Sequence, residues 1–292
     1  MQEFSYTAPR TLAEAQADLA RGNGDARVLA GGTDLLVQLR EGRRQARLVV
    51  DIKSVPEVNA LEYRPETGLV IGAAVPCYRI VDFLEREGLY PGLAAAAGLI
   101  GGTQIQGRAT LGGNLCNASP AADSIPALIV HRAVCRVYGP RGYREVAAED
   151  FCLAPGQNAL EHGEFLVAIQ VPAVGAGFGA HYLRFTPRNE MDIAVTGAAA
   201  ALQLSPDRGV ILSARVSLGA VAPTPLLVAE AGDYLAGKPP TGEVLRAAAE
   251  IARQAARPID DMRGTAAQRR HLAGVLTRRA LEKAADLAAK ER

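Results

Sequence analysis

Apolar residues recur along the chain with two different spacings, which together predict an α+β protein. Unbroken or alternating apolar runs indicate strands, and apolar residues repeated every three or four positions indicate helices. The pattern Thr11-x-x-Glu14 is typical of a capping box, and it opens a helix with apolar positions at Leu12, Ala15 and Leu19. We therefore expect strands and helices to be interleaved from the start of the chain.

The first 174 residues are predicted to form two lobes. Strands are expected at residues 4–6, 28–30, 47–52, 69–74, 125–130, 134–138 and 165–171, and helices at residues 33–39, 78–87 and 92–99. Residues 53–59 interrupt these patterns. We place the first lobe at residues 1–58 and the second at residues 59–174.

A glycine-bearing linker at residues 175–179 marks a change of pattern. Antiparallel strands are expected beyond it at residues 182–185, 193–204 and 210–218, with a hairpin turn at residues 206–209. Thr224-Pro225, Thr241 and Thr265 are signals for helix starts. Residues 179–292 are therefore predicted to be a C-terminal domain, a three-stranded antiparallel sheet followed by helices.

Charge and hydropathy exclude several classes of partner. The 32 basic and 31 acidic residues leave a formal net charge of +1, which gives no general attraction to nucleic acid or to an anionic membrane. No stretch approaches the roughly 20 apolar residues of a membrane span, and residues 1–10 lack the pattern of a secretory signal. We expect a cytoplasmic protein without a membrane span.

Neither the cysteines nor the histidines are spaced as metal ligands. The residues concerned are Cys77, Cys116, Cys135, Cys152, His131, His162, His181 and His271. Most of the cysteines are expected to be buried, and Cys116 lies inside a glycine motif. The sequence predicts no metal site and no catalytic acid-base or nucleophile set.

Two pairs of adjacent glycines are each followed by small or polar residues. The first pair also follows an apolar run and precedes a predicted helix start, and the second leads to a carboxylate. They lie in AGGTDLL, residues 30–36, and in TLGGNLCNASPAAD, residues 110–123. Glycine has no Cβ and tolerates positive φ, so backbone N–H groups there approach an anionic ligand closely. One such pair could be only a turn, but two together predict a nucleotide site. The Rossmann spacing G-x-G-x-x-G is absent from both, which favours a dinucleotide site of another design.

These two segments and RNEMDIAVTGAAAAL, residues 188–202, resemble in order and spacing the FAD-binding medium subunit of molybdenum hydroxylases. That family includes the relatives of xanthine dehydrogenase and carbon monoxide dehydrogenase, and the resemblance covers nearly the whole chain. It implies a PCMH-type FAD-binding fold, in which two lobes enclose FAD ahead of the C-terminal domain.

The resemblance also implies which residues bind FAD. The pyrophosphate is expected between Leu29, Ala30, Gly31, Gly32, Thr33, Asp34 and Leu35 on one side and Thr110, Leu111, Gly112, Gly113 and Asn114 on the other. Asp123 is expected to serve the ribose region, and Leu166 to pack on the isoalloxazine ring. Ile100 or Gly101 replaces an aromatic ring of some relatives, and Arg184 falls where relatives often have lysine beside the flavin.

The function that the resemblance implies is electron transfer inside a larger enzyme. A separate molybdenum subunit would oxidise the substrate, and a separate 2Fe-2S subunit would pass the electrons to this FAD. This chain would then reduce the terminal acceptor. The expected assembly is a dimer of heterotrimers. Two alternatives remain open: a free-standing flavoprotein oxidoreductase of the same fold, and a flavin-free scaffold.

Overall fold

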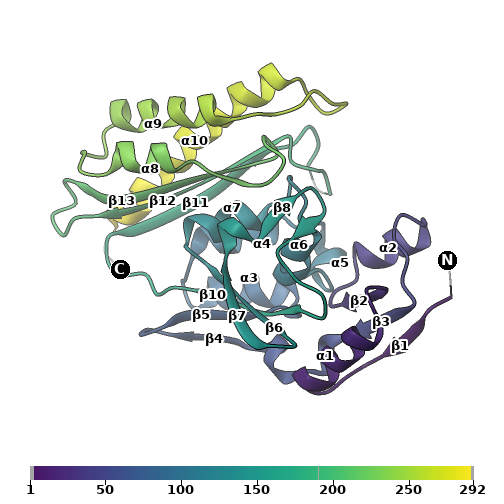
Figure 1. Ribbon diagram of the computed structural model, residues 1–292. Coiled ribbons are helices and arrows are strands. Elements are labelled where there is room, and N and C mark those ends of the chain that lie inside the picture. The colour runs from purple at the N-terminus through teal and green to yellow at the C-terminus, as the bar shows by residue number, and fades with distance from the viewer. Residues whose placement is uncertain (1–2, 190, 291–292) are drawn as a thin grey trace.

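The computed structural model describes residues 3–189 and 191–290 and contains three main sheets, which follow one another along the chain (Figure 1). The first is parallel, with strand order β1-β3-β2. Its strands are β1 (Ser5–Thr7), β3 (Leu48–Asp51) and β2 (Ala26–Leu29), and its helices are α1 (Leu12–Arg21) and α2 (Leu35–Arg40). The Thr11 hydroxyl caps α1 by accepting the N–H of Glu14, as the sequence predicted.

The second sheet is antiparallel and belongs to the central lobe. Its strands, in spatial order, are β4 (Leu61–Arg64), β5 (Gly68–Gly72), β10 (Phe165–Val171), β6 (Val134–Gly139) and β7 (Gly142–Ala147). The helices of this lobe are α3 (Cys77–Arg86), α4 (Pro91–Gly98), α5 (Thr103–Gln106), α6 (Leu111–Asn117) and α7 (Ser124–Val130). A small hairpin, β8 (Cys152–Ala154) and β9 (Gln157–Asn158), lies beside α6.

The strand predicted at residues 125–130 is wrong, because this run forms helix α7. Every residue of α7 is buried, since the helix lies between the central lobe and the C-terminal sheet. An apolar run that is buried on all sides carries no periodicity that separates a strand from a helix. Pro126 lies in the first turn, where its missing N–H costs no helical hydrogen bond.

The C-terminal domain is an antiparallel sheet covered by three helices on its outer face (Figure 1). Its elements are β11 (Phe178–Phe185), β12 (Thr196–Leu204), β13 (Ile211–Gly219), β14 (Leu226–Leu227), α8 (Ala229–Leu235), α9 (Gly242–Ala255) and α10 (Ala266–Ala289). The three long strands lie where strands were predicted, although β11 begins at Phe178, before the predicted residue 182, and Thr241 and Thr265 cap α9 and α10. Thr224-Pro225 starts no helix: the short strand β14 follows it, and α8 begins at Ala229.

The separation of the sheets along the chain supports the predicted domains at residues 1–58, 59–174 and 179–292, and these boundaries stay a prediction. Within the described ranges, no helix is long and apolar enough to span a membrane.

His131, at the end of α7, is a buried histidine between the central lobe and the C-terminal domain. Its ring lies between those of Tyr90 and Phe178, at centroid distances of 5.6 and 5.7 Å, and its Nδ1 is 2.7 Å from the Ala127 carbonyl oxygen. Burial lowers the pKa of His131 from 6.5 to about 4. The fold therefore stabilises the neutral ring.

This burial predicts a loss of stability in mild acid. Between about pH 6.5 and 4 the unfolded chain binds a proton at His131 that the folded chain rejects, so the free energy of unfolding should fall by up to about 3 kcal/mol as the pH is lowered. Urea unfolding at a series of pH values measures the slope. His131→Leu should flatten it over this range, and an equal slope in the variant would contradict the assignment.

Candidate cofactor site

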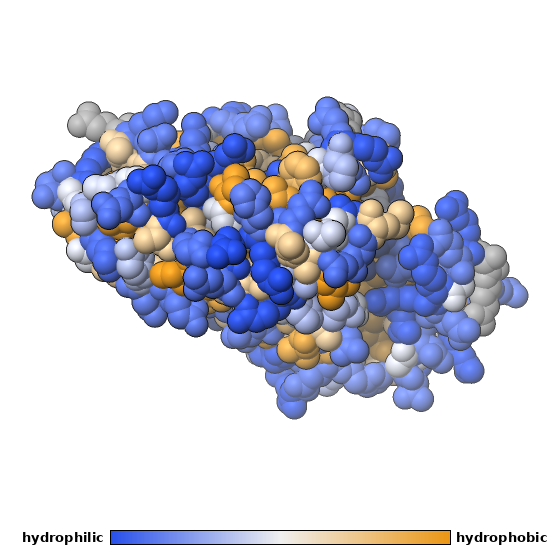
Figure 2. Space-filling view, turned by 90° about the horizontal axis from the view of Figure 1, so that it is seen from above, coloured by the Kyte–Doolittle hydropathy of each residue, from blue (hydrophilic) through white to orange (hydrophobic). Residues whose placement is uncertain are grey.

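A cavity of about 1080 Å³, counting the part open to solvent, lies between the first lobe and the central lobe. In the view from above, the N-terminal lobe projects from the body of the molecule with a hollow between them (Figure 2). The cavity has the size of a small-molecule or cofactor site. Its walls include both glycine segments, so residues about 80 positions apart in the chain face one another across one space.

The first glycine segment connects β2 to α2. Gly31 packs on the backbone of the central lobe so closely that a Cβ would collide with the Arg108 carbonyl group. Gly32 has a φ of +77°, which favours glycine, and a Cβ there would lie 2.8 Å from the Leu29 side chain. Glycine is therefore required at position 31 for the contact between the lobes and at position 32 for the turn.

The second segment forms the start of α6, and its two glycines have different roles. The Thr110 hydroxyl caps this helix by accepting the N–H of Gly113 at 2.8 Å. Gly112 is buried against Ala73, which directly follows β5, and a Cβ would lie 2.6 Å from the Ala73 carbonyl oxygen. A Cβ on Gly113 would meet only the Thr110 hydroxyl, at 3.1 Å, because this residue faces the cavity.

Polar groups from both lobes line one region of the cavity. The Gln38 amide on α2 donates to Asn117 Oδ1 at the end of α6, 3.2 Å away, which links the lobes across the opening. Packing around the Asp34 carboxyl raises its pKa, and the nearby Arg44 opposes that shift. This region offers amide donors, amide acceptors and a guanidinium group to a polar ligand.

Another region of the wall is apolar. It includes Ile100, which follows α4, and Phe165 and Leu166 at the start of β10. Cys116 also lines the cavity, and burial raises the pKa of its thiol to about 12, so it stays protonated at neutral pH. An aromatic ring system suits the apolar part of this wall.

Most of the predicted site residues meet in this cavity. Those in its wall are Ala30, Gly31, Gly32, Thr33, Asp34, Leu35, Thr110, Gly112, Gly113, Asn114 and Leu166. Leu29 and Leu111 are buried in the cores behind the two segments. Gly101, Asp123 and Arg184 lie outside the wall, and the last two form an ion pair of 2.6 Å with each other.

The predicted set omitted several wall residues, among them Arg27, Gln38, Arg44, Asn117 and Asn158. Two of them carried a usable signal. Gln38 follows Asp34 by four positions and Asn117 follows Asn114 by three, so each pair shares one face of a helix. The others come from elements without a glycine motif, and only the three-dimensional fold places them at the cavity.

Comparisons with known proteins assign this architecture to one class, FAD-binding proteins of molybdenum-dependent oxidoreductases. Residues 2–174 match the family described as the FAD binding domain in molybdopterin dehydrogenase. Residues 181–284 match the CO dehydrogenase flavoprotein C-terminal domain. The chain therefore belongs to the family of FAD-binding medium subunits of molybdenum hydroxylases, and FAD is the cofactor of this family.

Individual relatives are similar over almost their full length. The xanthine dehydrogenase FAD-binding subunit of Escherichia coli is 33% identical, with 96% of this chain and 95% of the relative covered. The carbon monoxide dehydrogenase medium chain of Hydrogenophaga pseudoflava is 34% identical, with 96% of each covered.

Solved structures agree with this assignment. The carbon monoxide dehydrogenase of Hydrogenophaga pseudoflava that lacks the Mo-pyranopterin moiety of the molybdenum cofactor has a chain that superposes with a TM-score of 0.91 at 34% identity, over 97% of both chains. A chain of quinoline 2-oxidoreductase from Pseudomonas putida 86 superposes with a TM-score of 0.90 at 30% identity, over 99% of both. The predicted PCMH-type α+β fold is confirmed.

The two glycines of α6 should respond differently to alanine. Gly112→Ala forces a Cβ into the backbone of Ala73 and should lower the free energy of unfolding by roughly 1–3 kcal/mol. Gly113→Ala should be neutral or stabilising by up to about 1 kcal/mol, since alanine favours helix and its Cβ would meet only the Thr110 hydroxyl, which can shift slightly. Denaturant unfolding of both variants tests this, and equal destabilisation would contradict the geometry.

Proposed function

We propose that this chain holds FAD in the cavity between its two lobes and transfers electrons through it within a multi-subunit molybdenum hydroxylase. The observation that carries the proposal is the meeting of both glycine segments at one cavity in a member of this FAD-binding family. The segments from Ala30 to Leu35 and from Thr110 to Asn114 would hold the pyrophosphate from two sides, through backbone N–H groups that glycine leaves accessible.

The distribution of wall residues supports one orientation of the cofactor. The apolar region with Ile100 and Leu166 suits the isoalloxazine ring, and the polar region with Gln38, Arg44 and Asn117 suits ribose and adenine groups. Leu29 and Leu111 anchor the two segments in their cores. The apolar part of the wall, where the flavin would lie, would be supported from outside the cavity by Gly101, Asp123 and Arg184.

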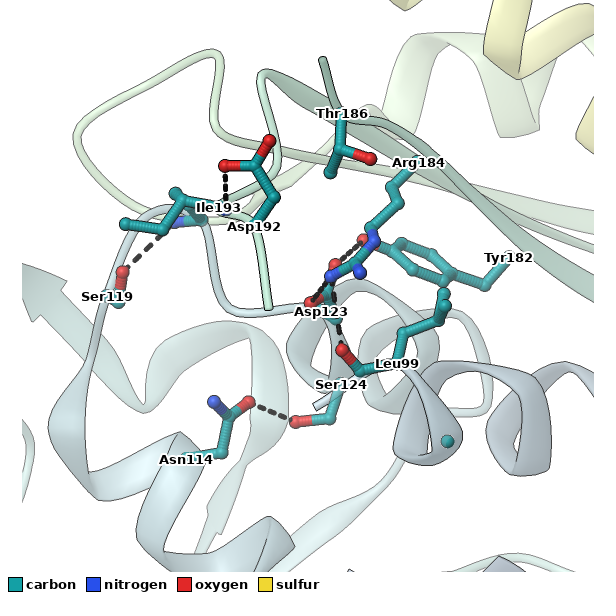
Figure 3. A network of polar contacts seen from close by, with 12 residues as sticks. Leu99, Asn114, Ser119, Asp123, Ser124, Tyr182, Arg184, Thr186, Asp192 and Ile193 are labelled. Carbon is teal, nitrogen blue, oxygen red and sulfur yellow. Dashed lines mark hydrogen bonds and ion pairs between the residues drawn. The ribbon is translucent and has the colours of Figure 1, made fainter. Parts of the chain in front are cut away.

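The chain's own residues would bind and orient the cofactor and keep water from it. When bound, FAD supplies the capacity to accept and release electrons. The Arg44 guanidinium would offset the pyrophosphate charge, and the Ser124 hydroxyl, donating to Asn114 Oδ1 at 2.6 Å, fixes the Asn114 amide at the cavity wall (Figure 3).

The partners would supply the remaining redox centres. Relatives of this chain are named as medium chains and FAD-binding subunits, which implies further subunits in those enzymes. We propose that a 2Fe-2S small subunit donates electrons to this chain and that a molybdenum large subunit oxidises the substrate. The complex would be a cytoplasmic dimer of heterotrimers.

FAD should be bound without a covalent link. The cavity presents Cys116 only as a protonated thiol, because burial raises its pKa to about 12. Acid precipitation of the purified protein should therefore leave the yellow cofactor in the supernatant, where absorbance measures it. Flavin that stays in the washed pellet would contradict non-covalent binding.

Gly113→Val should empty the site without unfolding the chain. The branched side chain would project into the cavity, and the loss of even one charge-assisted hydrogen bond, worth about 1.5–3 kcal/mol, lowers FAD affinity about tenfold or more. Flavin content per folded protein is the measurement, with circular dichroism as the check on folding. Gly175→Val, in open space away from the cavity, is the matched control.

The same variant tests electron transfer in the assembled enzyme. In the wild-type complex, reduction through the molybdenum subunit should bleach the flavin absorbance after the iron-sulfur centres are reduced. The Gly113→Val complex should reduce its iron-sulfur centres and then pass no electrons to the terminal acceptor. A wild-type flavin that stays oxidised beside reduced iron-sulfur centres would overturn the electron-transfer role.

A further inference from the structure

Within the described residues, every residue lining the cavity lies in the first two lobes, so the C-terminal domain contributes none of them. Arg184 on β11 links this domain to the turn that precedes Ile100. We propose that Arg184 and Asp123 are positioning residues that hold the turn at residues 99–101, and with it Ile100 in the cavity wall. The C-terminal domain would thereby control how the flavin is covered. This inference rests on the proposed binding of FAD in the cavity.

The link consists of three short contacts in a buried setting (Figure 3). Arg184 Nη1 donates to Asp123 Oδ2 at 2.6 Å and to the Leu99 carbonyl oxygen at 3.1 Å. The Tyr182 hydroxyl, from the same strand, donates to Asp123 Oδ1 at 2.7 Å. The Arg184 and Asp123 side chains are each only 10% exposed. A buried pair with all these partners fixes its neighbours in one geometry.

Few hydrogen bonds besides that from Arg184 hold this turn, although Leu99 and Ile100 also pack against the central core. Leu99 ends α4, and Gly101, with a φ of +66°, reverses the chain two residues later. The backbone bonds from Leu99 to Ala96 and from Ile100 to Ala97 are both 3.3 Å long. Besides Arg184, the Gln106 amide braces this region by donating to the Gly98 carbonyl oxygen at 2.6 Å.

The charges of the pair argue against a direct electrostatic role for Arg184. The guanidinium lies 2.6 Å from a carboxylate, so the pair presents a dipole to the cavity, and its field falls off faster than that of a single cation. Asp123 also begins α7, whose next residue, Ser124, binds Asn114 in the second glycine segment. The ion pair is thus connected on one side to the turn before Ile100 and, through α7, on the other side to the second glycine segment.

A second ion pair between the C-terminal domain and the central lobe offers a matched control for Arg184 and Asp123. Arg215 on β13 likewise joins the C-terminal sheet to the central lobe, through its Nε, which donates to the Ile129 carbonyl oxygen at 3.0 Å, and through an ion pair of 2.8 Å with Glu149. Both arginines therefore bind one carbonyl group and one carboxylate across the same domain boundary. Neither Arg215 nor Glu149 lines the cavity.

The test uses the full chain, purified with the subunits that assemble with it. Arg184→Met combined with Asp123→Asn removes the link without leaving an unpaired buried carboxylate. FAD should then dissociate about tenfold faster or more, as expected from one lost hydrogen bond to a charged group, and iodide should quench the flavin fluorescence more strongly. Arg215→Met combined with Glu149→Gln should change the dissociation rate less than about twofold.

A double-mutant cycle with Ile100→Ala asks whether the pair acts through Ile100. If it does, the Arg184 and Asp123 replacements should have little further effect on FAD dissociation in the Ile100→Ala chain, and the control pair should remain additive. Additive effects, or an equal effect of the control pair, would overturn the positioning role.

The midpoint potential of the flavin distinguishes a positioning role of Arg184 from a direct effect of its charge on the flavin. A fall in potential with an unchanged dissociation rate would assign Arg184 to the flavin's electrostatics and overturn the inference. Wild-type protein that binds no FAD would overturn the proposed function itself, so the two failures are distinguishable.

Discussion

The arrangement of this protein depends on two places where backbone packs on backbone with no room for a Cβ. Gly31 lies against the Arg108 carbonyl group and brings the first lobe onto the central lobe, and Gly112 lies against Ala73 and sets α6 on the segment that follows β5. The first contact fixes the distance between the lobes, and the second fixes α6 within the central lobe, so together they set the width of the cavity. Gly113, one residue further on, faces the cavity and has no side chain that would keep a ligand away from this wall.

The C-terminal domain packs against the side of the central lobe formed by α4 and α7. Its sheet covers α4 and α7, and Gly179 lets β11 approach the backbone of α10 so closely that a Cβ would collide with Ala284. Arg184, Tyr182 and Arg215 extend from that sheet into the central lobe. This domain, which contributes no described residue to the cavity wall, is thus joined to α7 and to the turn that follows α4.

Much of this architecture was predictable because its signals are local. The caps at Thr11, Thr241 and Thr265 and the long strands β12 and β13 follow from side chains within a few positions of one another. Helix α7 was missed because burial on all sides removes the periodicity that identifies a helix. The first strand signal after the linker was also too short, because β11 begins at Phe178.

The site was predictable at its glycines and less so elsewhere. Glycine pairs mark close backbone approach in the sequence itself, whereas the ion pair between Asp123 and Arg184 joins residues 61 positions apart. No local pattern indicates that these two side chains neutralise each other. The link between Gln38 and Asn117 spans 79 positions and depends on the closed lobes in the same way.

Hydrogen exchange of the backbone amides, with and without FAD, tests the central claim most directly, because the claim is that two distant segments share one ligand. The account predicts that FAD slows exchange in residues 30–35 and in residues 110–114 together, with the same dependence on FAD concentration. Protection of one segment alone, or of neither, would contradict a cofactor held between the lobes.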